Sequence, residues 1–314
     1  MVDAASKAFF HLLARSRGLQ RLASRYGLAT PASFARRFIA GESTDEAIAA
    51  ARAVEARGLT QTLDYLGESV SSAAAADQAT REYLEVIDDV VKAGVGRNVS
   101  LKLTQLGLDL DRVTAIDNLR RILEPATTHG FFVRIDMENS PYTEVTIEIF
   151  ETLWGLGYRN LGVVLQSALH RTPDDLERVL TVGGRVRLVK GAYKEPASVA
   201  HQRKADVDSA YVALMETLLK RGAFPAIATH DEAIIAHARA FVAREQIAKD
   251  RFEFQMLYGI RRDLQTSLVA EGYGMRLYIP FGRQWFPYFM RRLGERPANV
   301  AFVVRAMLRD RGAS

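Results

Sequence analysis

The 314-residue chain contains no cysteine, and this absence excludes several kinds of site at once. It has no disulfide framework, no thiolate metal site and no thiol nucleophile. Long apolar runs are also missing, since none approaches the ~20 residues that span a bilayer. The first residues, MVDAASKAFF, lack the layout of a signal peptide. Together these absences favour a cytoplasmic protein.

The chain also has only a small net charge. The chain has 42 lysines and arginines against 37 acidic residues, which gives a net charge of +5. The arginines are spread along the sequence, so we expect no nucleic-acid partner. No set of His, Asp and Glu has the spacing of a metal site, and we expect no metal. The 48% hydrophobic content is that of an ordinary globular protein.

Short apolar segments rich in β-branched residues alternate with amphipathic helical patterns along most of the chain. This alternation favours a parallel sheet. Eight such units closing on themselves make a (β/α)8 barrel of roughly 250 residues. An open doubly wound sheet is the alternative, but no GxGxxG motif follows any of these segments. The eight expected strands are TQTLDYL from Thr60, VSLKL from Val99, FFVRIDM from Phe131, LGVVLQ from Leu161, VRLVK from Val186, PAIATH from Pro225, RFEFQML from Arg251 and RLYIP from Arg276.

The length of the barrel divides the chain. We expect a helical arm at residues 1–57 and the barrel at residues 58–314. In the arm, STDEA from Ser43 predicts a helix start, because serine followed by glutamate three residues later forms a capping box.

Polar side chains gather at the ends of the expected strands, where a (β/α)8 barrel places its chemistry. Lys102 and Asp136 fall within apolar segments, where an unpaired charge is costly, so we expect them to belong to a site. KGAY from Lys190 offers an amine and backbone donors suited to a phosphate. The full set is Glu68, Lys102, Asp136, Gln166, Arg187, Lys190, Thr229, His230, Gln255 and Tyr278.

The segment FPYFMRRLGE from Phe286 places Arg291 and Arg292 side by side within a helical pattern. Successive helix residues point about 100° apart, so two adjacent guanidinium groups are best explained by one anion lying over that helix. Glu295 follows within one turn and can brace either arginine.

These segments also carry a family resemblance. VSLKLTQLG, RIDME, GVVLQ, RLVKGAY, ATHD, EFQMLYG, LYIPFG and RRLGE resemble, in order, the successive motifs of the proline dehydrogenase family, from about Glu68 to Asn299. The family has a distorted (β/α)8 barrel with its last helix across the barrel mouth. The length resembles that of the single-function bacterial members.

The resemblance implies a reaction and its partners. The family binds FAD and oxidises L-proline to pyrroline-5-carboxylate by hydride transfer to flavin N5, with electrons passing to a membrane quinone. A separate pyrroline-5-carboxylate dehydrogenase would act downstream, and the enzyme would be cytoplasmic or peripheral on the inner membrane.

The resemblance also implies roles for residues at matching positions. Asp136 and Arg187 would be catalytic, Glu68 would gate the pocket by pairing with Arg291, and Asp136 would order Lys102. Lys194 stands where many relatives have an aromatic residue, which leaves the adenine-end contacts open. The implied substrate contacts are Lys102, Tyr278, Leu257, Ala192, Tyr193, Arg291 and Arg292. The implied FAD contacts are Met137, Gln166, Arg187, Lys190, Gly191, Ala192, Thr229 and His230.

Two other functions remain compatible with the sequence. A Schiff-base lyase on the same barrel would use Lys102 or Lys190 as its amine nucleophile. A non-catalytic protein of the membrane surface would use residues 6–27, whose leucines and phenylalanines alternate with arginines in an amphipathic pattern. An arm packed on the barrel with a solvated basic face is the explanation that we favour for this stretch.

Overall fold

The structure is a computed structural model that describes residues 34–295, with side chains for residues 35–290. Most of the expected helical arm, residues 1–33, therefore lies outside the described residues. The boundary expected at residue 57 stays a prediction.

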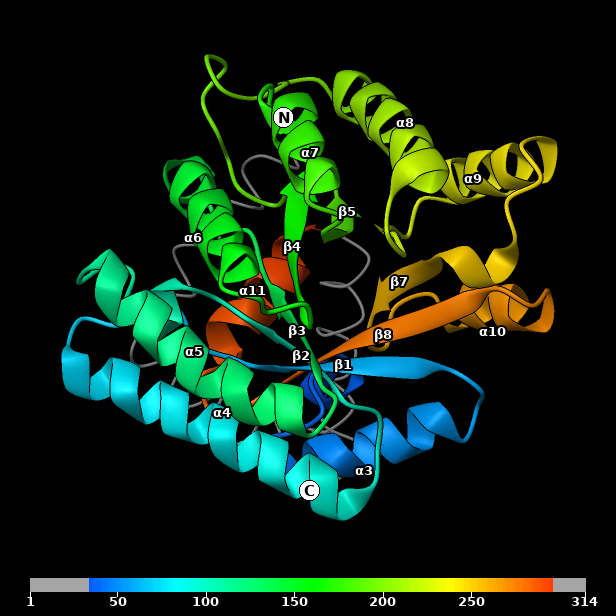
Figure 1. Ribbon diagram of the computed structural model, residues 1–314. Coiled ribbons are helices and arrows are strands. Elements are labelled where there is room, and N and C mark those ends of the chain that lie inside the picture. The colour runs from blue at the N-terminus through cyan, green and yellow to red at the C-terminus, as the bar shows by residue number, and fades with distance from the viewer. Residues whose placement is uncertain (1–33, 296–314) are drawn as a thin grey trace.

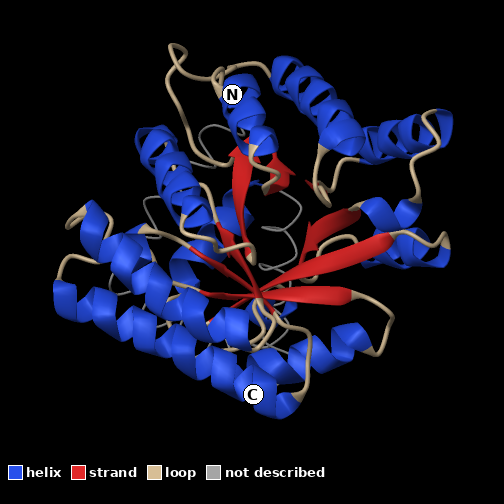
Figure 2. Ribbon diagram, viewed as in Figure 1, coloured by secondary structure: helices blue, strands red, loops and turns tan. Residues whose placement is uncertain are grey.

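Eight parallel strands close into a barrel in sequence order, with β1 pairing to β8 (Figure 2). Each of the eight expected strands is present, which confirms the barrel predicted from the alternating pattern. The strands are β1 Thr60–Tyr65, β2 Asn98–Leu101, β3 Phe132–Ile135, β4 Leu161–Gln166, β5 Arg185–Val189, β6 Ala226–Ala228, β7 Glu253–Leu257 and β8 Gly274–Phe281.

Helices surround the strands on the outside of the barrel (Figure 1). The α-helices are α3 Thr44–Glu55, α4 Ala73–Ala93, α5 Arg112–Thr128, α6 Thr143–Gly155, α7 Thr172–Thr181, α8 Lys204–Arg221, α9 Glu232–Arg244, α10 Arg262–Ala270 and α11 Trp285–Glu295. Short 3-10 turns are η1 Phe34–Arg37, η2 Thr104–Leu106, η3 Ser140–Tyr142 and η4 Lys249–Arg251.

The helix ends follow their sequence signals. Ser43 and Glu46 form the predicted capping box at the start of α3. Helix α4 ends at Gly94, whose φ of 69° suits a residue without a side chain. The helix start predicted at Ser43 is therefore confirmed.

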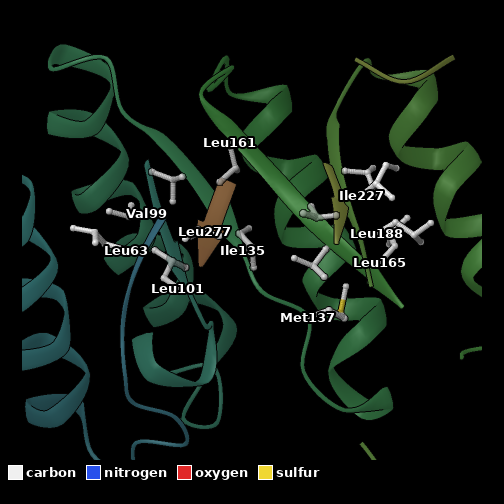
Figure 3. Packing of buried hydrophobic residues seen from close by; sticks show 14 of the residues in the cluster. Leu63, Val99, Leu101, Ile135, Met137, Leu161, Leu165, Leu188, Ile227 and Leu277 are labelled. Atoms are coloured by element: carbon white, nitrogen blue, oxygen red, sulfur yellow. The ribbon is translucent and has the colours of Figure 1, made fainter. Parts of the chain in front are cut away.

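The apolar core lies between the strands and the helices. Strand side chains alternate in direction, so Leu63, Val99, Leu101 and Ile135 point outward and pack in one buried cluster with the helices (Figure 3). Burying one such side chain contributes about 1.5–3 kcal/mol. Helix α3 shares this cluster through Ala47 and its buried neighbours, and so packs on the barrel wall.

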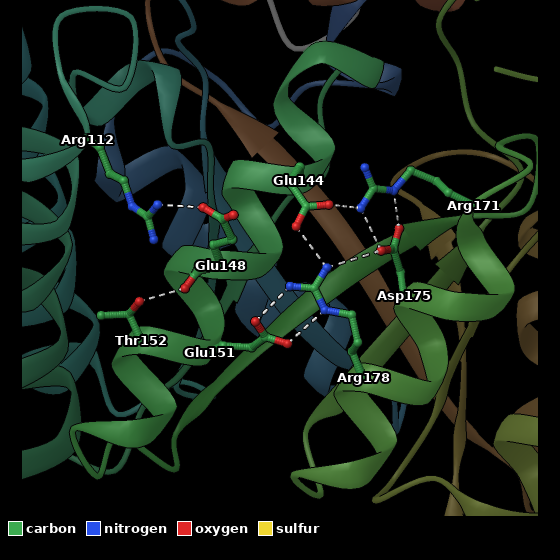
Figure 4. A network of polar contacts seen from close by, with 8 residues as sticks. All are labelled: Arg112, Glu144, Glu148, Glu151, Thr152, Arg171, Asp175 and Arg178. Atoms are coloured by element: carbon green, nitrogen blue, oxygen red, sulfur yellow. Dashed lines mark hydrogen bonds and ion pairs between the residues drawn. The ribbon is translucent and has the colours of Figure 1, made fainter. Parts of the chain in front are cut away.

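Ion pairs tie the outer helices together. Arg178 of α7 donates to Glu151 of α6 at 2.8 Å, and Arg171 donates to Asp175 at 2.8 Å (Figure 4). Arg112 of α5 also reaches α6, through Glu148. Most of these groups are partly exposed, so we assign them a modest structural role.

Helix α11 packs against a separate apolar cluster at the carboxyl end of β1 and β8. The Trp285 indole at its start donates to Glu42 Oε1 at 2.9 Å, which fixes the helix to the segment before α3. The expectation that the last helix lies across the barrel mouth stays a prediction, since residues 296–314 lie outside the described residues. The cluster comprises Ala35, Phe38, Ile39, Leu66, Trp285, Tyr288, Phe289 and Met290.

The described part of the chain has neither a membrane-spanning helix nor a cluster of metal-ligating side chains. Within residues 34–295, no helix is both long and apolar enough to cross a membrane. In the same part of the chain, no group of three or more His, Asp or Glu side chains is placed to hold a metal ion.

Candidate active site

A buried arginine links several strands inside the barrel. Arg187 of β5 is 4% exposed. Its guanidinium donates to Gln255 Oε1 at 2.6 Å and to Asp136 Oδ1 at 2.7 Å, and it also donates to Ser100 Oγ at 3.0 Å. These partners come from β7, β2 and the end of β3, none of which neighbours β5 in the sheet. Their side chains therefore meet in the barrel interior.

Asp136 is held from a second direction by a tyrosine. The Tyr278 hydroxyl donates to Asp136 Oδ2 at 2.7 Å, and the Arg187 guanidinium carbon lies 5.3 Å from the centre of the Tyr278 ring. Burial, together with the Asp136 and Asp64 carboxylates, raises the pKa of Tyr278 well above its ordinary value. The hydroxyl thus stays protonated and acts as a donor, which fixes the orientation of the Asp136 carboxylate.

Lys102 has a different ion-pair partner from the one expected. The two Asp136 oxygens accept from Arg187 and Tyr278, whereas Lys102 Nζ forms its ion pair with Asp64 Oδ1 at 3.8 Å. The ion-pair partner of Lys102 is therefore Asp64, and Asp136 acts on Lys102 only through its charge. Burial opposes the charged form of Lys102, but the Asp64 and Asp136 carboxylates outweigh it and raise the pKa of the ammonium. Lys102 is thus held as a cation.

A belt of hydrogen bonds joins the loops at the carboxyl ends of the first four strands. Thr104 accepts at Oγ1 from the Ser69 amide at 3.0 Å and donates from Oγ1 to Glu138 Oε2 at 2.8 Å. The Gln166 amide in turn donates to the Glu138 carbonyl at 2.7 Å. Burial raises the pKa of Glu138. The belt positions the loop that carries Glu68, which is itself half-buried.

The segment after β5 runs along this rim. Gly191 has a φ of 105°, and a Cβ there would lie 2.9 Å from Gln166 Oε1, so only glycine suits both the backbone and the space. Ala192 and Tyr193 follow and are exposed, with Tyr193 38% exposed. Met137 lies buried below. The segment therefore presents backbone groups and an aromatic ring to the mouth of the barrel.

Lys190 belongs to a cluster of paired charges. Its Nζ donates to Asp208 of α8 at 2.5 Å and to Asp231 at 2.7 Å, and Lys204 contacts the same two carboxylates. Two lysines and two aspartates leave the cluster with no net formal charge. A phosphate bound beside this cluster would therefore contact the Lys190 amine and backbone N–H groups. The cluster has no excess positive charge to attract it.

Two residues after β6 complete the rim. Thr229 Oγ1 accepts from the Asp231 amide at 3.1 Å, and His230 Nε2 lies 3.0 Å from the Leu257 amide. Because a backbone amide can only donate, Nε2 is the acceptor and Nδ1 carries the proton of the neutral ring. His230 and Leu257 are therefore held together where β6 and β7 end.

Comparison with known proteins decides the family. A model of the family described as proline dehydrogenase matches residues 47–305. The chain belongs to the proline dehydrogenase family. The family resemblance of its motifs is thereby confirmed, and the chain is an enzyme.

Individual relatives agree with this membership. The chain is 45% identical over 281 residues to a proline dehydrogenase of Deinococcus radiodurans, covering 88% of this chain and 91% of that protein. It is 40% identical over 302 residues to proline dehydrogenase 2 of Bacillus subtilis, covering 96% of this chain and 98% of that protein.

A solved structure supports the fold. Proline utilization A from Bdellovibrio bacteriovorus, inactivated by N-propargylglycine, superposes with a TM-score of 0.78 at 28% identity and covers 83% of this chain. The match spans 32% of that longer chain.

The structure brings most of the predicted family residues to one end of the barrel. Lys102, Asp136, Arg187, Gln255 and Tyr278 meet in the interior, and the other predicted contacts lie on the rim above them. Arg291 and Arg292 lie in α11, but their side chains fall outside the described ones, so their predicted role stays a prediction.

Sequence reasoning missed several residues of this site. Asp64 is a fully buried charge within the apolar segment TQTLDYL, which is the same signal that singled out Lys102. Glu138 directly follows two predicted site residues, Asp136 and Met137. Asp231 ends the motif ATHD but was given no role, and Asp208 gave no signal. Their contact with Lys190 could not be predicted, because it depends on how three separate elements meet.

Proposed function

We propose that the chain oxidises L-proline to pyrroline-5-carboxylate with FAD as its cofactor and passes the electrons to a membrane quinone. The observation that carries the proposal is the family match over residues 47–305, to which relatives named proline dehydrogenase add near-complete coverage. The buried network of Lys102, Asp136, Arg187 and Tyr278 supports it, because these strand-end groups suit a charged small substrate.

The described residues fit a flavin nucleotide. Arg187 offers a donor to a carbonyl group of a heterocycle. The Gln166 amide nitrogen already donates to the Met137 and Glu138 carbonyls, so Gln166 offers its Oε1 as an acceptor beside Gly191. Lys190 directly precedes Gly191, and we assign its Nζ to the phosphates of FAD. FAD bound here would supply the redox chemistry, as the acceptor of the hydride that leaves proline C5.

The substrate's own bond changes define what the protein must do. The C5–H bond breaks and its electron pair leaves with the hydride, while the nitrogen lone pair forms the C=N bond. The amine must first lose its ammonium proton, and the remaining N–H proton leaves with product formation. A pocket lined by Lys102 and arginines favours the neutral amine, because like charges disfavour its cationic form.

The chain's residues bind and orient this substrate. We assign Lys102, Arg291 and Arg292 to the proline carboxylate, which would receive charge-assisted hydrogen bonds from each. Tyr278 and Leu257 would contact the ring, with Ala192 and Tyr193 closing the wall. Arg187 carries a buried positive charge that favours the electron-rich reduced state of the cofactor. Asp136 holds Arg187 in place and balances its charge.

Glu68 is proposed as a gate. It lies on the rim loop beyond β1, next to Leu66, which packs against α11. A glutamate there would hold Arg291 over the closed pocket and exclude water. The Glu68→Ala, Arg291→Ala double-mutant cycle should then give a coupling energy above zero in kcat/KM. Strictly additive effects would reject the gate.

The alternative functions receive less support. A Schiff-base lyase needs a neutral lysine, whereas the pKa of Lys102 is raised and Lys190 donates to two carboxylates. The membrane-surface alternative rests on residues 6–27, which lie outside the described residues. A cytoplasmic enzyme that touches the inner membrane through this stretch would be compatible with a quinone acceptor, and a separate dehydrogenase would consume the product.

The test is a reaction of purified, FAD-loaded protein with L-proline and a soluble quinone. We expect mass spectrometry to find a product that lacks two hydrogens and matches pyrroline-5-carboxylate. The reaction without FAD is the control. If FAD-loaded protein forms no such product, the proposed function is wrong.

A further inference from the structure

Asp64 of β1 is a buried carboxylate without a hydrogen-bond donor. Its side chain is 0% exposed, and neither oxygen accepts a hydrogen bond from any residue that the structure describes. A buried carboxylate in this state is costly, since hydrogen bonds and partner charges normally offset its loss of water. Burial raises the pKa of Asp64, and the charge of Lys102 opposes this rise, so the charged form of Asp64 depends on Lys102.

The donors near Asp64, apart from Lys102, donate to other acceptors. The Tyr278 hydroxyl has a single proton, which it donates to Asp136, and the Arg187 guanidinium donates to Asp136, Gln255 and Ser100. What remains is the Lys102 ammonium, 3.8 Å from Asp64 Oδ1. Asp64 thus acts on its surroundings mainly through the charge of Lys102.

Lys102 is placed between Asp64 and the barrel mouth. Its side chain is 10% exposed, whereas that of Asp64 is fully enclosed. Among residues 35–290, no group accepts a hydrogen bond from Lys102 Nζ, and the 3.8 Å separation is longer than a hydrogen bond. The three ammonium protons are therefore available to an anion that enters from the mouth.

We propose that Asp64 is a positioning residue for substrate binding, which holds Lys102 charged and in place so that its ammonium binds the substrate carboxylate. The inference rests on the proposed function, since it takes proline as the substrate. The raised pKa of Lys102 agrees with it, because Asp64 is the carboxylate that contributes most to that shift. Asp64 itself would not touch the substrate.

The first test is Asp64→Asn, which keeps the shape and removes the charge. We expect the KM for L-proline to rise about tenfold, the size of one weakened charge-assisted bond. The bound FAD and its spectrum should not change. The inhibition constant of tetrahydrofuran-2-carboxylate, which has the carboxylate but no amine, should rise in parallel, while that of pyrrolidine, which has only the amine, should stay within twofold.

The outcomes separate the possible roles. An unchanged KM would overturn the inference, because Asp64 would then have no part in substrate binding. A larger effect on pyrrolidine than on tetrahydrofuran-2-carboxylate would also overturn it, because Asp64 would then act on the substrate amine. Asp175→Asn is the matched control, since Asp175 is a 2% exposed carboxylate on α7 outside the barrel. It should lower stability and leave the KM unchanged.

A second variant keeps the test decisive if Asp64→Asn does not fold. Asp64→Asn combined with Lys102→Met removes both charges and should give the same KM for proline as Lys102→Met alone. A further rise in KM would contradict a role that acts through Lys102. Turnover of L-proline by the wild-type protein is measured first. If there is none, both the proposed function and this inference are wrong. If the wild type turns over proline but the effects of the two substitutions on KM are additive, only this inference is wrong.

Discussion

Arg187 donates to Asp136 at 2.7 Å across the interior of the barrel, and both side chains are nearly enclosed, at 5% and 13% exposed. The pair joins β5 to the end of β3, and it lies within the cluster of residues that the family resemblance places at the active site. Because two opposite charges are buried together, each would be costly without the other.

This pairing predicts a large stability cost for one isosteric change. Asp136→Asn keeps the shape but leaves Arg187 without its counter-charge, so we expect the free energy of unfolding to fall by about 3–5 kcal/mol. Tyr278→Phe removes a neutral donor from the same carboxylate and should cost only about 1 kcal/mol. Urea denaturation of both variants measures the difference. Equal losses would mean that the charge of Asp136 is not what stabilises Arg187.

A second prediction concerns acid stability at the Lys190 cluster. The hydrogen bond from Lys190 is the main cause that lowers the pKa of Asp231 to about 2, from about 3.9 in an unfolded chain. A depressed carboxyl pKa stabilises the fold above the unfolded value, and this contribution is lost as the pH falls toward the folded value. It is worth about 1–2 kcal/mol after solvent screening.

Asp231→Asn measures that contribution, because asparagine can still cap α9 through the Ala233 amide. The difference in unfolding free energy between wild type and variant should be constant above pH ~5 and shrink toward zero near pH ~2. A difference that does not depend on pH would show that Asp231 stabilises the fold by a means other than its charge.

How much of this could be read from the sequence depends on the type of residue. The eight strands were predictable because each is a short apolar segment between helical patterns, although β6 has only three residues and Thr229 lies beyond its end. Lys102 and Asp136 were predictable as charges in apolar segments. Their partners were not, because the pairing of Lys102 with Asp64 and of Asp136 with Arg187 depends on how the barrel closes.

The adjacent arginines give a third prediction. Arg291→Met and Arg292→Met should each raise the KM for proline roughly ten- to hundredfold, since a charge-assisted bond to the carboxylate is lost. FAD should stay bound in both. Arg244→Met on the exposed face of α9 is the control and should leave the KM unchanged. If both test variants keep the wild-type KM, the proposal that Arg291 and Arg292 bind the proline carboxylate is wrong.

A fourth prediction separates the two rim lysines. Lys102→Ala should impair proline turnover and leave the flavin spectrum intact, because we assign it to the substrate. Lys190→Ala should lower the bound FAD, since it removes the amine that we assign to the phosphates. Lys204→Ala removes an exposed lysine that contacts the same carboxylates as Lys190 and should retain FAD. FAD loss of equal size in the Lys102 and Lys190 variants would erase the proposed distinction.

The most direct measurement of the central proposal is the visible spectrum of the FAD-loaded protein when L-proline is added without oxygen. The proposal requires that proline alone bleaches the flavin absorption bands, in proportion to the bound FAD, and that a quinone restores them. A protein that binds no FAD, or whose bound flavin keeps its oxidised spectrum with excess proline, would contradict it.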